Sequence, residues 1–324
     1  MEKNKTNNVA AFCQDIANAI REKKGSNEPI NAQNFANEIK NLPSGSAPRW
    51  TGHADVEGLK AIGWDDEDIA YYQQHGVNWN EEDDEYHKVS DDNKALYGVL
   101  TADNIQDYKD RIVYLPKIDT SAKTSLSFES FRKMVAIPMI DTSAFTTMGA
   151  MFRNCATLTC VPNLDTSKVK SFNYAFQYCC SLSHVALQIS EATTSVIYML
   201  QDCFSLLEWH LTENKSITSI NSILYRCSSL RKLVIEDASA YTNFASALYG
   251  CYALQDLRIN SLAVSIDLAS CYALSMSSLL YIIMNEKASS EITVKLRNEI
   301  YDIAMEDTNI QAALAAHPNI LLAK

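Results

Sequence analysis

The chain has 324 residues, 47% of them apolar, which is enough for two or three domains with a sizeable core. Its formal charge of −11 comes from 39 acidic and 28 basic side chains without a basic cluster, which argues against nucleic acid as a main partner. The N-terminus lacks an apolar signal-peptide core, and no apolar run is long enough to span a membrane. No membrane partner is therefore predicted, and synthesis in a reducing cytoplasm is expected.

Residues 1–42 are predicted to form two short amphipathic helices. Apolar side chains recur at helical spacing over residues 8–24, and Gly25 is placed to end that helix. Asn31 can cap a second helix over residues 32–41. Two such helices are too small to enclose a core, so this segment is expected to dock on another protein or to self-associate. Pro, Gly and Ser over residues 43–49 predict a linker.

A motif within this segment points to a particular group of proteins. Residues 16–42 read IANAIREKKGSNEPINAQNFANEIKNL: a helix ending in Ala-Ile-Arg-Glu-Lys, a Gly-containing turn, and then Ile-Asn-x-x-x-Phe-Ala-x-Glu-Ile. This order resembles an N-terminal module of tail and baseplate-associated proteins of tailed phages. The resemblance implies that residues 1–42 anchor the chain to other virion proteins, and a homo-oligomer on the particle is expected.

Residues 50–110 are predicted to form a small acidic helical module and an N-terminal cap. Thirteen acids and two basic residues lie between Asp55 and Asp92. A helix with acids in its first turn is predicted for the sequence WDDEDIAYYQQHG. A second helix of this kind is expected to begin in NWNEEDDEYHKV. The acids at 81–85 are alternatively a divalent-cation site, although they lack the spacing and central Gly of a calcium loop. Thr101 is expected to cap a helix through Lys109 that covers the first repeat.

A period of 24 residues organises the sequence from about Ser127 to Leu280. Five cysteines mark it, each followed three residues later by a leucine: Cys155, Cys179, Cys203, Cys227 and Cys251. The period and a Leu-x-x-Leu-x-Ile core predict a leucine-rich-repeat solenoid, in which short strands stack into a parallel sheet. The cysteine column is predicted to point inward as free thiols.

The expected fold class is therefore α/β: coils of about 24 residues over residues 111–280, an α-helical N-terminal region, and a helical cap over residues 281–324. Residues 115–121, 137–143 and 161–167 share a Pro and an Asp-Thr-Ser turn. Because Pro removes a ladder donor, the first strands should be short or irregular. After the repeats, the sequence predicts a helix, a strand, two helices and a last strand following Pro318.

Two further resemblances concern the repeats. Phe152-Arg-Asn-Cys155-Ala-Thr-Leu158 and Phe176-Gln-Tyr-Cys179-Cys-Ser-Leu182 resemble BspA-like leucine-rich repeats, which occur in bacterial adhesins, protist surface proteins and phage virion proteins. Residues 52–98 are similar to a module found with such repeats in phages of gut Bacteroidales, including the crAss-like group. This implies an association with virions but gives no residue a role.

Candidate site residues lie on the strands rather than in a catalytic motif. The sequence has no phosphate loop, nucleophile motif or metal-ligand spacing, so no enzyme, cofactor or metal site is predicted. Residues one, two and four after each repeat leucine should point out of the sheet. The second position forms an outward row of Cys160, His184, Glu208, Lys232 and Asp256. With neighbours from the other positions, this predicts a binding patch of His184, Glu208, His210, Arg231, Lys232, Asp256 and Arg258.

Two interpretations of this patch stay open. Glu208, Lys232 and Asp256 alternate in sign, so they fit a structural charge ladder worth roughly 0.2–1 kcal/mol per pair. Alternatively the patch recognises a partner, since repeat solenoids bind on the sheet face.

The expected function is that of a non-enzymatic phage virion structural protein, on a tail fibre or tail-associated appendage. It would be made in the host cytoplasm, attach through its N-terminus, and present the repeats to other proteins or to a host surface protein or glycan. The alternatives are a bacterial BspA-like surface adhesin, for which no export signal is visible, and a cytoplasmic protein-binding scaffold.

Overall fold

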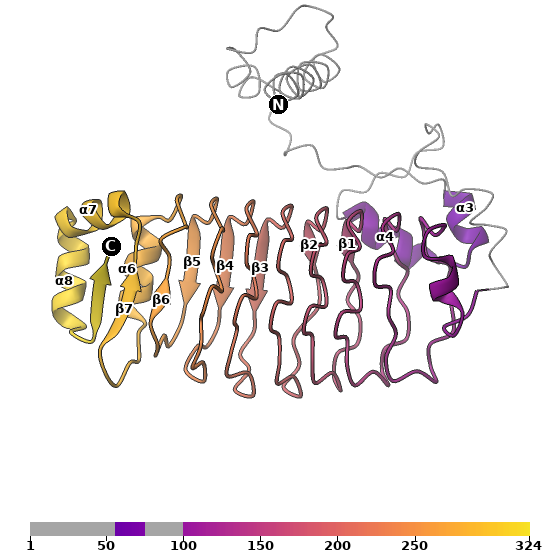
Figure 1. Cartoon of the computed structure of the whole chain (residues 1–324), viewed down its shortest axis with the longest axis horizontal. Coiled ribbons are helices and arrows are strands. Elements are labelled where there is room, and N and C mark those ends of the chain that lie inside the picture. Colours follow the sequence, from indigo (N-terminus) through magenta and orange to yellow (C-terminus); the bar gives the residue numbers. More distant parts are fainter. Residues whose placement is uncertain (1–55, 75–99) are drawn as a thin grey trace, which may run out of the picture. The chain divides into compact units, whose positions relative to one another are not determined.

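The computed structural model describes residues 56–74 and 100–324, which belong to one compact unit, Gly52–Lys324. The described residues form a mixed α/β arrangement with short parallel strands in three small sheets and no closed barrel (Figure 1). The helices expected over residues 8–24 and 32–41, the second acidic helix start and the cation site at 81–85 lie outside the described residues.

Strands in two of the sheets pair in parallel with a strand one 24-residue unit further along the chain. Strand β1 (Cys160–Val161) pairs with β2 (His184–Val185), and β3 (Glu208–Leu211), β4 (Lys232–Ile235) and β5 (Asp256–Ile259) form a second sheet. Along β4, Leu233 and Ile235 are buried, while Lys232 is exposed and Val234 is half-buried. The parallel pairing predicted from the repeat is confirmed for these strands.

The first units have little strand, as their prolines predict. Tyr114 and Ala136 make a single parallel bridge, and β1 is two residues long. The strands of the units that lack this proline, β3 to β5, are four residues long. Strand β2 has no proline and is still only two residues long, so proline is one cause of short strands here and not the only one.

The cysteine column lies in the core. All five repeat cysteines are fully buried, and all eight cysteines in the described ranges are free thiols. The thiol of Cys203 donates to the carbonyl of Phe176 at 3.2 Å, and the other repeat cysteines make the equivalent bond to the residue 27 positions earlier. Burial raises the pKa of Cys155 to about 12, which keeps the thiol protonated and able to donate. The inward-facing column is confirmed.

The residue before each repeat cysteine has a left-handed backbone conformation, with φ between 60° and 79°. These residues are Asn154, Tyr178, Asp202, Arg226 and Gly250. The first four of these donate their N–H to a carbonyl 23 residues later, as Tyr178 does to Gln201 at 2.9 Å. These turns therefore add hydrogen bonds between units beyond those of the strands. Four of the five left-handed positions hold a side chain, so the repeats tolerate a backbone conformation that favours glycine.

The chain after the last cysteine follows the predicted order of elements. The elements are α6 (Met276–Met284), β7 (Ile292–Lys295), α7 (Asn298–Glu306), α8 (Thr308–Ala316) and β8 (Ile320–Ala323). Strand β7 lies between β6 (Ile266–Asp267) and β8, all parallel. The Ser275 and Asp307 side chains cap α6 and α8, respectively.

The helix expected over residues 101–109 is shorter than predicted. Residues Ile105–Tyr108 form a 3₁₀ helix, η2, and the Thr101 hydroxyl accepts from the N–H of Asn104 in the turn that precedes it. Ile105 is buried in the repeat core, so this segment does contribute to the core beside the first repeats. Ile105 is the only buried residue of this 3₁₀ helix. The segment therefore lacks the apolar stripe that would favour a longer α-helix.

Candidate binding face

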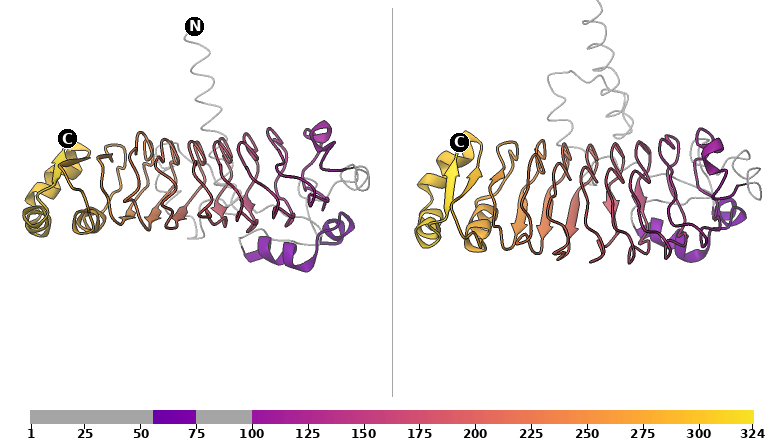
Figure 2. Two further views of the ribbon diagram at one scale, coloured as in Figure 1. Left: turned by 90° about the horizontal axis from the view of Figure 1, so that it is seen from below. Right: turned by 60° about the horizontal axis from the view of Figure 1, so that its bottom comes forward.

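Two helices before the repeats cover part of the outward row. Helices α3 (Val56–Ala61) and α4 (Asp66–Gln74) lie against the first units (Figure 2). Beneath them the row is apolar and buried: Tyr114, Ala136 and Cys160 are each 0 or 1% exposed. Cys160 lies in the outward row that the repeat spacing predicts, but it is buried rather than exposed. It is buried because α4 packs on it, which repeat spacing alone cannot show.

Hydrogen bonds attach these helices to the strands. The Trp64 indole donates to the carbonyl of Leu115 at 2.7 Å, and the Tyr71 hydroxyl donates to that of Val161 at 2.6 Å. The Tyr72 hydroxyl donates to the carbonyl of Ile137 at 2.7 Å and accepts from its N–H at 2.9 Å. Equivalent positions on three successive units are therefore bonded to residues 64–72, which makes α4 and the turn before it part of the repeat structure.

Charged contacts hold the start of α4. The buried carboxylate of Asp68 accepts from the N–H of Met139 at 2.6 Å and lies 3.2 Å from the Lys117 ammonium. Lys117 also contacts Asp65 at 2.6 Å, and this bond lowers the pKa of Asp65. Burial disfavours the charged ammonium, but the bonds to both carboxylates outweigh it and raise the pKa of Lys117. The pKa of Asp65 is lowered and that of Lys117 is raised, as expected for an attractive ion pair.

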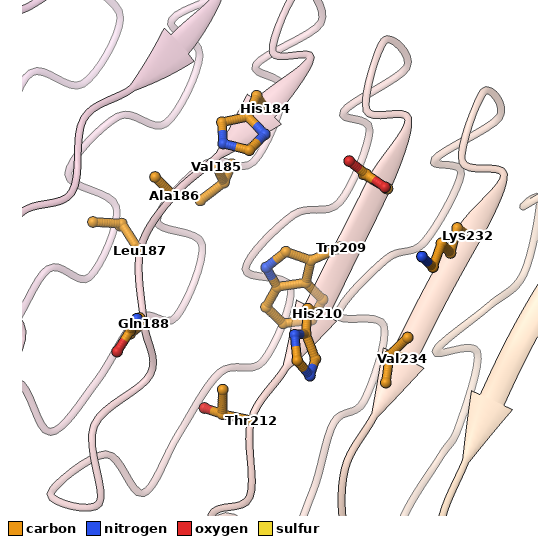
Figure 3. A pocket seen from close by; sticks show the side chains of 11 residues that line it. His184, Val185, Ala186, Leu187, Gln188, Trp209, His210, Thr212, Lys232 and Val234 are labelled. Carbon is orange, nitrogen blue, oxygen red and sulfur yellow. The ribbon is translucent and has the colours of Figure 1, made fainter. Parts of the chain in front are cut away.

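Beyond Cys160 the same row is polar, with Glu208 and Lys232 exposed, and it borders a hollow of about 390 Å³. Figure 3 shows the indole of Trp209 in this hollow, between strand β3 and the segment that carries Ala186 and Leu187. Two features explain the hollow. Strands β2 and β3 belong to separate sheets, and Ala186 offers only a methyl group where the next unit has His210. Trp209 is 5% exposed and forms the floor.

The charges on this face do not form the ladder that their order suggests. Asp256 pairs with Arg258 on its own strand at 3.2 Å, and His210 pairs with Glu236 at 2.8 Å. Glu208 and Lys232 are Cα partners on β3 and β4, but in the described part of the chain neither forms an ion pair. An acid and a base therefore stand side by side on neighbouring strands with their charges unpaired.

The structure brings most of the predicted patch together. His184, Glu208, His210 and Lys232 line the hollow, whereas Asp256 and Arg258 lie on the next strand. Arg231 is exposed but does not line the hollow.

Other residues at the hollow do not belong to the predicted patch. Gln188 and Thr212 line it, and Glu236 holds His210 beside it. These three residues stand six positions after a repeat leucine, so continuing the alternation by one more outward step would have found them. Trp209 stands three residues after Leu206, at an inward position of the repeat, and its edge reaches the hollow where β2 and β3 are separate. Together these groups offer ionic and hydrogen-bonding contacts around an apolar floor.

The described ranges contain no group of three His, Cys, Asp or Glu side chains placed to hold a metal ion. None of their helices combines the length and apolar character needed to cross a membrane. Comparison with protein-family models, with curated proteins and with solved structures gives no match.

Proposed function

We propose that this chain is a non-enzymatic structural protein of a tailed-phage particle, carried on a tail fibre or tail-associated appendage. In this proposal residues 1–42 attach the chain to other virion proteins. Residues 111–280 form a BspA-like leucine-rich-repeat solenoid that displays the binding face to a host surface protein or glycan. The motifs at residues 16–42, 52–98 and 152–182 support the assignment to a particle, and the parallel pairing at a 24-residue interval supports the solenoid.

One observation carries the recognition part of this proposal. The outward row is apolar where α3 and α4 cover it and is polar from His184 onward, with Glu208 and Lys232 exposed. A row that only stabilised the fold would be expected to pair its charges, but Glu208 and Lys232, beside the hollow, form no ion pair with any residue that the structure describes. Unpaired charges of both signs suit electrostatic complementarity with a partner.

Particle assembly tests the anchoring part. A fragment of residues 50–324 retains the compact unit that begins at Gly52, so it should fold as a soluble, cooperative protein but fail to join the particle. Incorporation would be measured by purifying particles and quantifying the fragment against the full chain. A fragment that incorporates normally would show that the repeats or the acidic module make the attachment instead.

A face variant tests the display part. Replacing Glu208, His210, Lys232 and Arg258 together with alanine should leave assembly intact and abolish attachment of particles to host cells. A matched control replaces Lys168, Lys170 and Glu191, which are exposed but lie outside the hollow, and should attach normally. Equal attachment by both variants would remove the binding face from the proposal.

A further inference from the structure

The turn around the cysteine column carries a group of exposed tyrosines. The large apolar side chains that are exposed in the described ranges fall into two regions, the C-terminal cap and this turn. In the turn they are all tyrosines, 37% to 52% exposed: Tyr174, Tyr178, Tyr249, Tyr252 and Tyr272. Exposed aromatic side chains that gather on one surface mark an interaction site, and tyrosine combines an apolar ring with a polar hydroxyl.

The position that follows each cysteine forms a row of flat groups along the repeats. Phe204, Ser228, Tyr252 and Tyr272 occupy this position in successive units. The rings of Tyr252 and Tyr272 stack with their centroids 5.0 Å apart, and the guanidinium of Arg297 lies 4.3 Å from the centroid of Tyr272. This spacing is close to the separation of about 4.8 Å between parallel strands, so each unit supplies one layer of the stack.

The stack is interrupted at Ser228. Tyr252 packs one ring face on Tyr272, so its other face is directed towards the preceding unit, where Ser228 has only a hydroxymethyl group. The ring of Tyr252 is 44% exposed. Gly250, which has a left-handed conformation two residues before Tyr252, adds no side chain there. The row therefore lacks one ring next to an open tyrosine face.

An ion pair forms the far side of this gap. The guanidinium of Arg226 lies 5.5 Å from the ring centroid of Phe204 and 3.2 Å from the carboxylate of Asp202, which is buried. Both contacts draw the Arg226 side chain towards the unit before its own and away from Tyr252. The carboxylate also balances the charge of the guanidinium.

We infer that the gap at Ser228 binds one neutral pyranose ring of a host-surface glycan. A sugar ring has a face of C–H groups, which stacks on Tyr252, and hydroxyls, which bond to the Ser228 hydroxyl and to the remaining N–H groups of Arg226. A neutral ring fits because Asp202 already pairs with Arg226. This gap is separate from the binding face, and the inference rests on the proposed function only in taking the repeats to be displayed to a host surface.

The size and chemistry of the gap favour a sugar over a protein partner. A specific protein interface buries about 800 Å² on each partner, whereas this gap is one unit wide on a turn. An aromatic side chain of a peptide could stack on Tyr252, but its ring would offer no acceptor to the Ser228 hydroxyl or to Arg226. A sugar ring supplies both kinds of contact.

Binding of the purified full chain to an array of immobilised neutral oligosaccharides tests this inference. The chain should bind at least one of them, with an affinity that changes little with salt concentration because the ligand is uncharged. Ser228→Tyr supplies the missing ring, so it should weaken binding at least about tenfold without lowering the thermal midpoint. Tyr252→Ser removes the stacking face and should weaken binding to a similar extent. The control Tyr178→Ser removes a tyrosine that is 41% exposed but lies outside the row, and it should bind like the parent.

Several results would overturn the inference. These are no binding to any oligosaccharide, sugar binding that Ser228→Tyr leaves unchanged, and attachment to host cells that protease treatment abolishes but glycosidase treatment does not affect. The variant with alanine at 208, 210, 232 and 258 should still bind the array, because those positions lie on strands β3 to β5. Loss of sugar binding in that variant alone would place the sugar on the binding face instead. Failure here leaves the proposed anchoring intact, because incorporation of the 50–324 fragment into particles is measured separately.

Discussion

At the scale of single residues, the repeat cysteines combine two roles that a sequence pattern does not distinguish. Each fills a fully buried position, and each thiol donates to a carbonyl of the preceding unit, at 3.0 to 3.2 Å. The spacing of 24 residues was sufficient to predict the inward column. The hydrogen bond could not be predicted, because its acceptor is determined by the path of the turn between units. Cysteine therefore acts here as a small apolar residue with a weak donor.

Substitutions at Cys203 should separate these roles. Cys203→Ala removes the thiol donor, but the carbonyl of Phe176 still accepts from the N–H of Cys179 at 3.0 Å, so the loss should cost only about 0.5–1.5 kcal/mol of unfolding free energy. Cys203→Asp places an unpaired carboxyl in a fully buried site and should cost more, at least about 3 kcal/mol. Denaturant unfolding of the full chain would measure both. An aspartate variant as stable as the parent would show that the thiol is not in the core.

At the scale of elements, α3 and α4 behave as part of the repeat sheet, and a tyrosine pair allows this to be tested. Tyr72→Phe removes a buried hydroxyl that bonds both the N–H and the carbonyl of Ile137, so it should destabilise the packing of α4 by about 1–3 kcal/mol. Hydrogen exchange should rise at Ile137 and over residues 56–74, but not over β3 to β5. The matched control, Tyr71→Phe, loses one bond to the carbonyl of Val161 and should have a smaller effect.

The elements also show where sequence reasoning succeeds. Helix α4 was predicted from its acidic first turn, and the C-terminal order of helices and strands from periodicity, because both are local signals. The position of α4 on the outward row is a long-range property: Tyr72 reaches a residue 65 positions away. The candidate site was predictable only in part, because the repeat spacing identified His184, Glu208 and Lys232. The hollow depends on a break between two sheets that no local pattern marks.

At the scale of the whole molecule, carboxylates with lowered pKa link stability to acid. Hydrogen bonds from Lys117 lower the pKa of Asp65, and bonds from serines two residues later lower those of the turn aspartates Asp119, Asp141 and Asp165. The unfolded chain, with carboxyl pKa values near 3.8, binds these protons more readily than the folded chain. Their contribution is therefore present above the unfolded pKa and is lost as pH falls through the folded pKa.

The thermal midpoint of the full chain should consequently change little between about pH 7 and pH 5 and fall below about pH 4. Lys117→Met removes the cation that lowers the pKa of Asp65, so this variant should be less stable near neutral pH and lose less stability on acidification. Lys170→Met, at an exposed position that does not act on these carboxylates, should follow the parent curve. Calorimetry across this pH range would measure all three proteins. A midpoint that rises below pH 4 would mean that these carboxylates do not stabilise the fold, and that relief of the net charge of −11 dominates instead.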